Sequence, residues 1–170
     1  MDITELILFQ HHEQRRMFAL LDDIDRGDTD KLAAVWARLT ILLEVHAEAE
    51  EKYFYPRLLT IGTGAGGEDS AGSETQDAIK DHNDIRDAVA EAGTHAAGSD
   101  KWWTAVINAR IANSDHMAEE EREDLADFRQ HADLQIRHDI AVEFVAYEAQ
   151  HAGGIRIQNK DPQDYVDEHT

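Results

Sequence analysis

Two pairs of residues have the types and the spacing that metal binding needs. His46 stands four residues before Glu50, and His116 stands four residues before Glu120. Residues four apart on a helix lie on one face, one turn from each other. Each pair can therefore present an imidazole and a carboxylate in one direction, and helical bundles build metal sites from such inward-facing side chains.

Both pairs belong to an internal repeat. His82 follows His11 by 71 residues, and His116 follows His46 by 70 residues. The segments that start at His11 and His82 also share an acidic residue two positions on and an arginine four positions on. The matched offsets predict two helical hairpins of similar length, each supplying a histidine and then a His-x-x-x-Glu pair.

The first histidine of each hairpin lies on an apolar, core-facing stripe. Apolar residues flank His11 and His82 at helical spacing, and this pattern is typical of buried helix faces. His11 is preferred to its neighbour because the repeat and the stripe both select it, and His12 remains the alternative. Burying four imidazoles and two carboxylates is costly unless each polar atom has a partner, and a pair of cations would provide one. The predicted metal ligands are His11, His46, Glu50, His82, His116 and Glu120.

Nitrogen and oxygen donors without sulfur suit iron, manganese or zinc. Two ions that share the glutamates would lie roughly 3.5–4 Å apart, as in other two-metal sites.

Other polar residues near the predicted ligands have simpler interpretations. Asp81 is a candidate to orient a ligand histidine. Glu51 and Glu121 are reserve ligands if the helical register is shifted by one residue. Ion pairs on helix surfaces are expected for Glu13, Arg15, Asp84 and Arg86.

The composition narrows the classes of function. The 170-residue chain has a net charge of −20, so it offers no basic stripe for nucleic acid or for an anionic membrane. It has no cysteine, which excludes disulfides and thiolate chemistry. We see neither a signal peptide nor a stretch of membrane-spanning length. We therefore expect a soluble cytoplasmic protein without nucleic-acid or membrane partners, and its oligomeric state is left open.

The helices that must position the ligands begin and end at recognisable residues. Asp2 and Glu5 predict a capping box at the start of the first helix. Asp28 or Thr29 can cap the second helix, and Pro56 should kink it or start a new turn. These boundaries place His11 and His46 well inside their helices.

The second half of the chain is divided in the same way. The glycine-rich stretch 62–73 predicts a loop, and Ser73 with Gln76 predicts a capping box for the third helix. Ser99 or Asp100 can cap a fourth helix. These boundaries place His82 and His116 in the interior of the third and fourth helices.

The stretch 101–151 contains neither glycine nor proline, and one helix of that length would not fit a compact domain. We therefore expect a bend at 128–133, a fifth helix after it, and an extended tail at 155–170. The predicted fold is all-α. It is an antiparallel up-down four-helix bundle at 1–130, with a C-terminal helix and tail at 131–170 packed on the same domain.

The order H, HxxxE, H, HxxxE over residues 1–130 resembles the hemerythrin-like (HHE cation-binding) proteins. This resemblance implies a non-haem di-iron centre, oxo- or hydroxo-bridged, with the six ligands given above. Some bacterial relatives have a tyrosine just before a proline after the second helix, near or on one iron. Tyr55 before Pro56 occupies that place here.

The sequence departs from the oxygen-carrying hemerythrins at two positions. Those proteins have a second histidine where Arg86 stands, and an aspartate where Glu121 stands. One fewer histidine argues against simple oxygen carriage. We expect redox chemistry on hydrogen peroxide or dioxygen, with catalase- or peroxidase-like turnover as the enzymatic form. The alternative is a protein that binds or senses oxygen, nitric oxide or iron without turnover.

Overall fold

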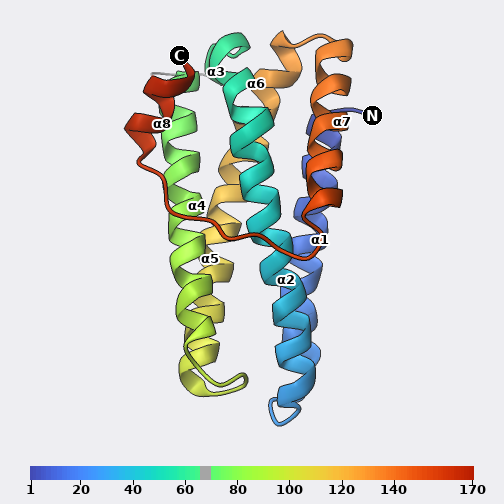
Figure 1. The fold of residues 1–170 in the computed structure, drawn as a ribbon, viewed down its shortest axis with the longest axis vertical. Helices are drawn as coiled ribbons and strands as arrows, with labels where there is room; N and C mark the ends of the chain where they lie inside the picture. The colour runs from blue at the N-terminus through green and yellow to red at the C-terminus, as the bar shows by residue number, and fades with distance from the viewer. Residues whose placement is uncertain (66–69) are drawn as a thin grey trace.

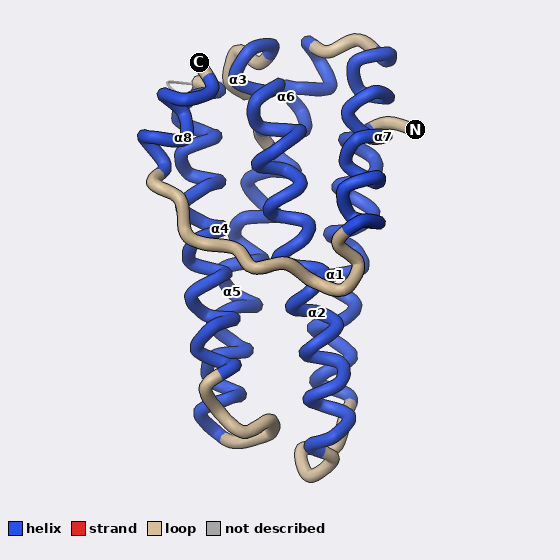
Figure 2. Tube along the Cα trace, viewed as in Figure 1, coloured by secondary structure: helices blue, strands red, loops and turns tan. Residues whose placement is uncertain are grey.

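The computed structural model describes residues 1–65 and 70–170 (Figure 1). Every regular element in these two ranges is helical, as Figure 2 shows, so the predicted all-α class is confirmed. The elements are α1 (Ile3–Asp23), α2 (Thr29–Ala49), the π-helical turn η1 (Glu50–Phe54), α3 (Tyr55–Ile61), α4 (Ala71–Gly93), α5 (Asp100–Arg122), α6 (Asp124–His131), α7 (Leu134–Gln150) and α8 (Pro162–His169).

Four long helices run side by side and form the predicted bundle (Figure 1). The first hairpin joins α1 to α2, and the second joins α4 to α5. At the upper end in Figure 1, α2 continues through η1 into α3, and α5 continues into α6. Helix α7 packs on α1 and α2, while α8 packs on α4. None of the described helices is long and apolar enough to cross a bilayer.

Six of the described helices, α1, α2, α4, α5, α7 and α8, begin at a side chain that accepts a hydrogen bond from a free backbone N–H group. The predicted caps at Asp2, Asp28 and Ser99 are all formed. The reciprocal half of the first box is not formed, because Glu5 binds Arg129 instead. The box predicted at Ser73 lies three residues earlier, since Ser70 caps α4 and Ser73 bonds back to it. Residues 66–69 of the predicted loop lie outside the described residues.

The kink predicted at Pro56 is spread over a π-helical turn. Proline has no N–H to donate, so it suits the first turn of α3, where it lies. In the turn before it, the backbone N–H of Tyr55 bonds to the carbonyl of Glu50, five residues back. Such single π-helical turns are rare and occur frequently at functional sites.

The C-terminal half of the chain differs from the prediction in two ways. The bend expected at 128–133 is found, with Asp133 capping α7, but a second break at Glu123 separates α5 from α6. The tail at 155–170 is extended only in part. Residues 162–169 form α8 because Asp161 caps its start and Pro162 fits its first turn.

A polar layer divides the core into two apolar clusters. The upper cluster of buried residues includes Ile7, Phe54, Leu58, Phe128 and Phe144. The lower cluster includes Leu21, Leu39, Trp36, Trp102 and Trp103, so the three tryptophans are core residues as predicted. In α1 and α4, a buried histidine (His11 or His82) stands between the residues of the two clusters, and in α2 His46 lies where the upper cluster begins, next to Val45. Packing of the apolar clusters on either side holds these histidines near the middle of the bundle axis.

Helix α7 should be an integral part of the structure. Phe144 is fully buried in the upper cluster, with its ring 5.9 Å from the ring of His46. Replacing it with alanine should lower the free energy of unfolding by about 3–5 kcal/mol, since it leaves a cavity. Urea denaturation measures this change. Val142→Ala, at a position of the same helix that is 48% exposed, should change the same quantity by about 0.5 kcal/mol or less. Equal effects of both substitutions would contradict the placement of α7.

Candidate metal centre

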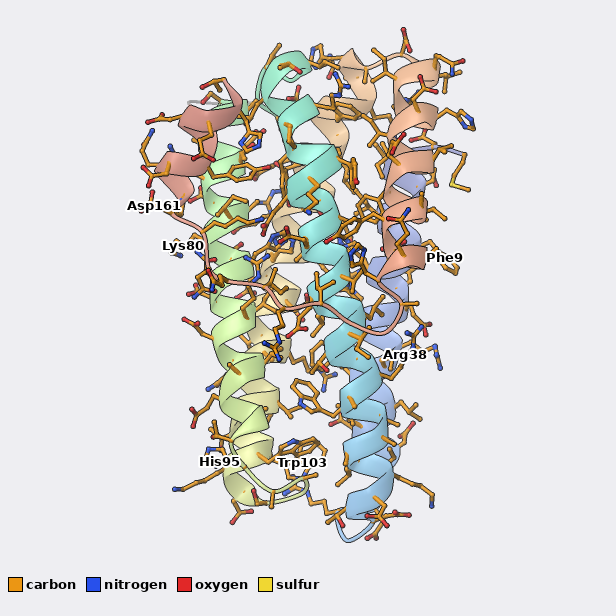
Figure 3. All side chains as sticks on the ribbon, viewed as in Figure 1. Phe9, Arg38, Lys80, His95, Trp103 and Asp161 are labelled. Carbon is orange, nitrogen blue, oxygen red and sulfur yellow. The ribbon has the colours of Figure 1, made fainter. Side chains whose placement is uncertain are left out.

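The structure brings the six predicted ligands together at the middle of the bundle. The two hairpins each supply two histidines and one glutamate: α1 and α2–η1 carry three of these residues, and α4 and α5 carry the other three. All six are at most 3% exposed. His12, the alternative to His11, is exposed to solvent. Figure 3 shows nitrogen-bearing side chains in the interior between Lys80 on α4 and the first hairpin, well above Trp103.

Glu50 lies between two groups of histidines. His11, His46 and Glu50 form one group whose ligand atoms all lie within 4.8 Å of one another, and Glu50, His82 and His116 form the other. One oxygen of Glu50 is 2.8 Å from Nε2 of His46, and the other is 3.3 Å from Nε2 of His82. The same carboxylate therefore faces both groups.

Glu120 mirrors this arrangement from the second hairpin. Its Oε2 is 3.2 Å from Nε2 of His11 and 4.0 Å from Nε2 of His116. Its other oxygen accepts a hydrogen bond from the Tyr55 hydroxyl at 3.1 Å. Two glutamates therefore stand between a histidine pair from the first hairpin and a histidine pair from the second.

Several of these atoms have no hydrogen-bond partner among the described residues. They are Nε2 of His11, Nε2 of His46, both carboxylate oxygens of Glu50 and Oε2 of Glu120. Their contacts among the described residues are the close approaches to one another given above, at 2.8–3.3 Å. Buried polar atoms without well-formed hydrogen bonds are costly, and a bound cation would satisfy all of them. Two donors that each lie about 2.1 Å from one ion are roughly 3.0–3.4 Å apart. Most of the separations here fall in or close to that range, so the residues fit a metal pair.

The outer nitrogens of three histidines are held by acceptors. Nδ1 of His82 donates to Glu51 at 2.7 Å, and Nδ1 of His11 donates to Glu121 at 2.9 Å. Nδ1 of His46 donates to Gln10 at 2.6 Å. These bonds fix the rings so that each Nε2 points to the centre, as is usual for histidines that bind metals.

The fourth histidine differs from the other three. The nearest carboxylate oxygen to Nδ1 of His116 belongs to Asp81 and lies 3.8 Å away, which is beyond hydrogen-bond distance. The orienting bond considered for Asp81 is therefore not formed. Nε2 of His116 instead lies 3.1 Å from Nε2 of His82.

Glu51 and Glu121, named above as reserve ligands, lie outside the central cluster. Each also binds an arginine from the helix of the histidine that it holds: Arg86 at 2.7 Å from Glu51, and Arg15 at 2.8 Å from Glu121. Arg86 is buried, so its prediction as a surface residue was wrong. The shared His-x-x-x-Arg spacing of the repeat was the available signal for both arginines.

The C-terminal segment reaches the same carboxylate. Nζ of Lys160 binds Glu51 and lies 3.0 Å from an oxygen of Glu48. The Tyr165 hydroxyl donates to the backbone carbonyl of Glu51. Asn83, the neighbour of His82, exchanges two hydrogen bonds with the backbone of Lys160. Nothing in the sequence pattern placed these residues at the centre.

Burial and neighbouring charges set the protonation of the cluster without a metal ion. Burial works to lower the pKa of His11, but Glu120 and Glu121 raise that pKa to about 9. Burial works in the same direction on His82, and Glu50 and Glu51 raise its pKa to about 9. Burial lowers the pKa of His116 well below its usual value, and the charge of His82 adds to this.

The carboxylates are perturbed as well. Burial alone would raise the pKa of Glu50, but the charges of His46 and His82 hold it well below its usual value. Burial and the charge of Glu50 raise the pKa of Glu120. Burial, with Glu120 and Glu50 close by, also raises the pKa of Tyr55 well above its usual value. The phenol is therefore protonated and donates to Glu120, and it forms part of the wall of the centre.

Comparison with known proteins agrees with this arrangement. A family model described as the hemerythrin HHE cation-binding domain matches residues 2–128. Comparisons with curated proteins and with solved structures gave no match. The matched range contains the six clustered residues and Tyr55, and it ends before α7 and α8. With this match over most of its length and cation-binding chemistry at its centre, the chain belongs to the hemerythrin HHE cation-binding family.

Proposed function

We propose that this protein binds two iron ions at the centre of its bundle and uses them in redox chemistry on hydrogen peroxide or dioxygen. The observation that carries the proposal is the set of buried nitrogen and oxygen atoms that face one another without hydrogen-bond partners. Its support comes from the two histidine groups that share Glu50 and from the cation-binding family.

The ligand assignment follows the geometry. One ion would be held by His11 and His46, and the other by His82 and His116. Both would share the carboxylates of Glu50 and Glu120, which face both histidine pairs. Imidazole and carboxylate donors without sulfur also suit manganese and zinc, so the choice of iron rests on the redox chemistry that we propose.

This donor set leaves room for a reacting molecule. Each ion would receive two imidazoles and one oxygen from each of two carboxylates, fewer donors than the six of an octahedral site. Turnover at a metal requires such an exchangeable position. When bound, an iron pair would supply electrons to one molecule of hydrogen peroxide, which is reduced to water, and accept electrons from a second, which is oxidised to dioxygen.

The protein side chains set the environment of that chemistry. Phe54 and Phe128, both fully buried in the upper cluster, help to exclude bulk water from one side. Tyr55 holds a proton on its hydroxyl at 3.1 Å from Glu120. Arg86 occupies the position of a further histidine but points its guanidinium to Glu51, so it supplies charge to the ligand support and no ligand.

Metal analysis tests the centre directly. The protein purified with its native metal should contain about two iron ions per chain, with oxo-to-iron charge-transfer bands in the visible and near-ultraviolet spectrum. Glu50→Gln should reduce the iron content to well below one ion per chain, because Glu50 is common to both groups. Glu44→Gln, on α2 before the π-helical turn and with no part in the cluster, should retain both ions. Full iron content in Glu50→Gln would contradict the assignment.

A second prediction concerns Glu51, which accepts the hydrogen bond that orients His82. Glu51→Gln should weaken metal binding by about 10- to 100-fold, the usual effect of losing the carboxylate behind a ligand histidine. Glu48→Gln is the matched control, because Glu48 also binds Lys160 but makes no bond to His82. Competition with a chelator of known affinity measures both variants. Equal affinities would show that Glu51 does not support the centre.

The reaction itself is tested with hydrogen peroxide. We expect the iron-loaded protein to release oxygen continuously, one O₂ and two H₂O for every two H₂O₂ consumed. An oxygen electrode follows the release, and the Glu50→Gln protein shows the background from free iron. A stable change in the spectrum without oxygen release or other peroxide consumption would reject the enzymatic form. It would favour a protein that binds or senses oxygen, nitric oxide or iron.

A further inference from the structure

A small acidic cavity lies between α4 and the α5–α6 segment, next to the candidate metal centre. Its volume is about 20 Å³, which suits roughly one water-sized species. It is lined by Glu74, Asp77, Ala78, Asp81, His116, Glu119, Glu120, Glu123 and Asp124. Seven of these nine residues are acidic and none is Lys or Arg, so the cavity attracts cations and is too small for an organic substrate.

The carboxylates lead from the surface to the centre. Asp77 and Glu119 are exposed, and Asp81 and Glu123 are partly exposed. Asp124 and Glu120 are buried, at 4% and 1% exposure. The inner end is formed by His116 and Glu120, two of the residues assigned above to the metal pair. Acidic side chains therefore line the path from solvent to the residues assigned as ligands.

Asp124, on the buried side of the cavity, is the residue whose side chain lacks a partner. It lines the cavity, and its side chain forms no hydrogen bond or ion pair with any residue that the structure describes. Asp127, which is buried to a similar degree, shows the usual alternative: it accepts from the backbone N–H groups of Thr63 and Gly64. A buried carboxyl group without such partners is costly to ionise, and a cation in the cavity would offset that cost.

We propose that this cavity is an uptake site for a divalent cation, through which Fe²⁺ passes from solvent to His116 and Glu120. The proposal rests on the metal-binding function proposed above. Carboxylates alone hold a first-row divalent ion less tightly than a set that includes imidazoles. An ion held by Asp124 and its acidic neighbours is therefore drawn onward to the histidines.

Stopped-flow uptake of Co²⁺ by the metal-free full-length chain tests this route, because Co²⁺ gains visible absorption when imidazoles bind it. The double variant Asp77→Asn, Glu119→Gln removes two exposed charges at the outer end, and neither side chain has a hydrogen-bond or ion-pair partner among the described residues. At low ionic strength its uptake rate should fall about tenfold, the lower range of electrostatic steering. The final absorbance should not change, since every ligand is intact.

The matched control is the double variant Asp23→Asn, Glu143→Gln. It removes the same two charges from exposed positions on α1 and α7, away from the cavity. Its uptake rate should stay within about twofold of the original protein, and at about 1 M salt the difference between the two double variants should vanish. Equal rates for the two double variants at low salt, with full final absorbance, would overturn the uptake route alone.

A variant of Asp124, on the buried side of the cavity, tests the route independently. Asp124→Asn keeps the shape of the cavity and removes the carboxyl group that would bind the ion, so it should slow uptake without lowering the melting temperature of the metal-free protein. Unchanged uptake in this variant would also overturn the route. If the original protein bound no Co²⁺ at equilibrium, the proposed metal centre would fail, and the uptake route with it.

Discussion

The structure depends on one constraint: four imidazoles and two carboxylates are buried in the middle of a helical bundle. Each of these groups loses hydrogen bonds to water, so each must find a partner inside the protein or bind an ion. The outer nitrogens of His11, His46 and His82 meet this need through Glu121, Gln10 and Glu51. The inner atoms do not, and they face one another across the centre. The apolar clusters above and below hold this layer in place, because a shift of either hairpin along its axis would bury the polar layer against apolar side chains.

The internal repeat has a structural meaning that extends beyond the ligands. Each hairpin ends its His-x-x-x-Glu pair with a second glutamate, and this residue holds the lone histidine of the other hairpin: Glu51 holds His82, and Glu121 holds His11. An arginine four residues after that histidine binds the same glutamate. The two hairpins are therefore joined by two equivalent His–Glu–Arg contacts. This explains why Arg86 can stand where the oxygen carriers have a histidine, since here that position supports the carboxylate behind His82.

The sequence predicted the features that depend on local spacing. The four long helices, their caps at Asp2, Asp28 and Ser99, and the inward direction of His46 and Glu50 all follow from helical periodicity over a few residues. Features that depend on contacts distant in the chain were missed. Arg86 is polar and was placed on the surface, but Glu51, 35 residues away, gives it a buried partner. Helix α8 was read as tail, although Asp161 and Pro162 carry an ordinary start signal, because eight residues are too few for periodicity to decide. The π-helical turn at Glu50 has no sequence signature other than the proline that follows it.

The surroundings of His82 and His116, the two histidines of the second hairpin, differ. His82 is held by many contacts, whereas His116 lies beside the acidic cavity. Glu51, which holds His82, is itself bound by Lys160 and Tyr165 of the C-terminal segment. These two residues lie outside the family-matched range. On the side of His116, the described residues provide no hydrogen bond to Nδ1, and the cavity beside the ring is lined mostly by acidic side chains. A ring without an orienting acceptor is the one that can adjust its position at least cost, since orienting hydrogen bonds are what fix ligand histidines. The acidic cavity thus meets the centre at its least constrained histidine, while the opposite histidine is held by the most extensive set of contacts in the cluster.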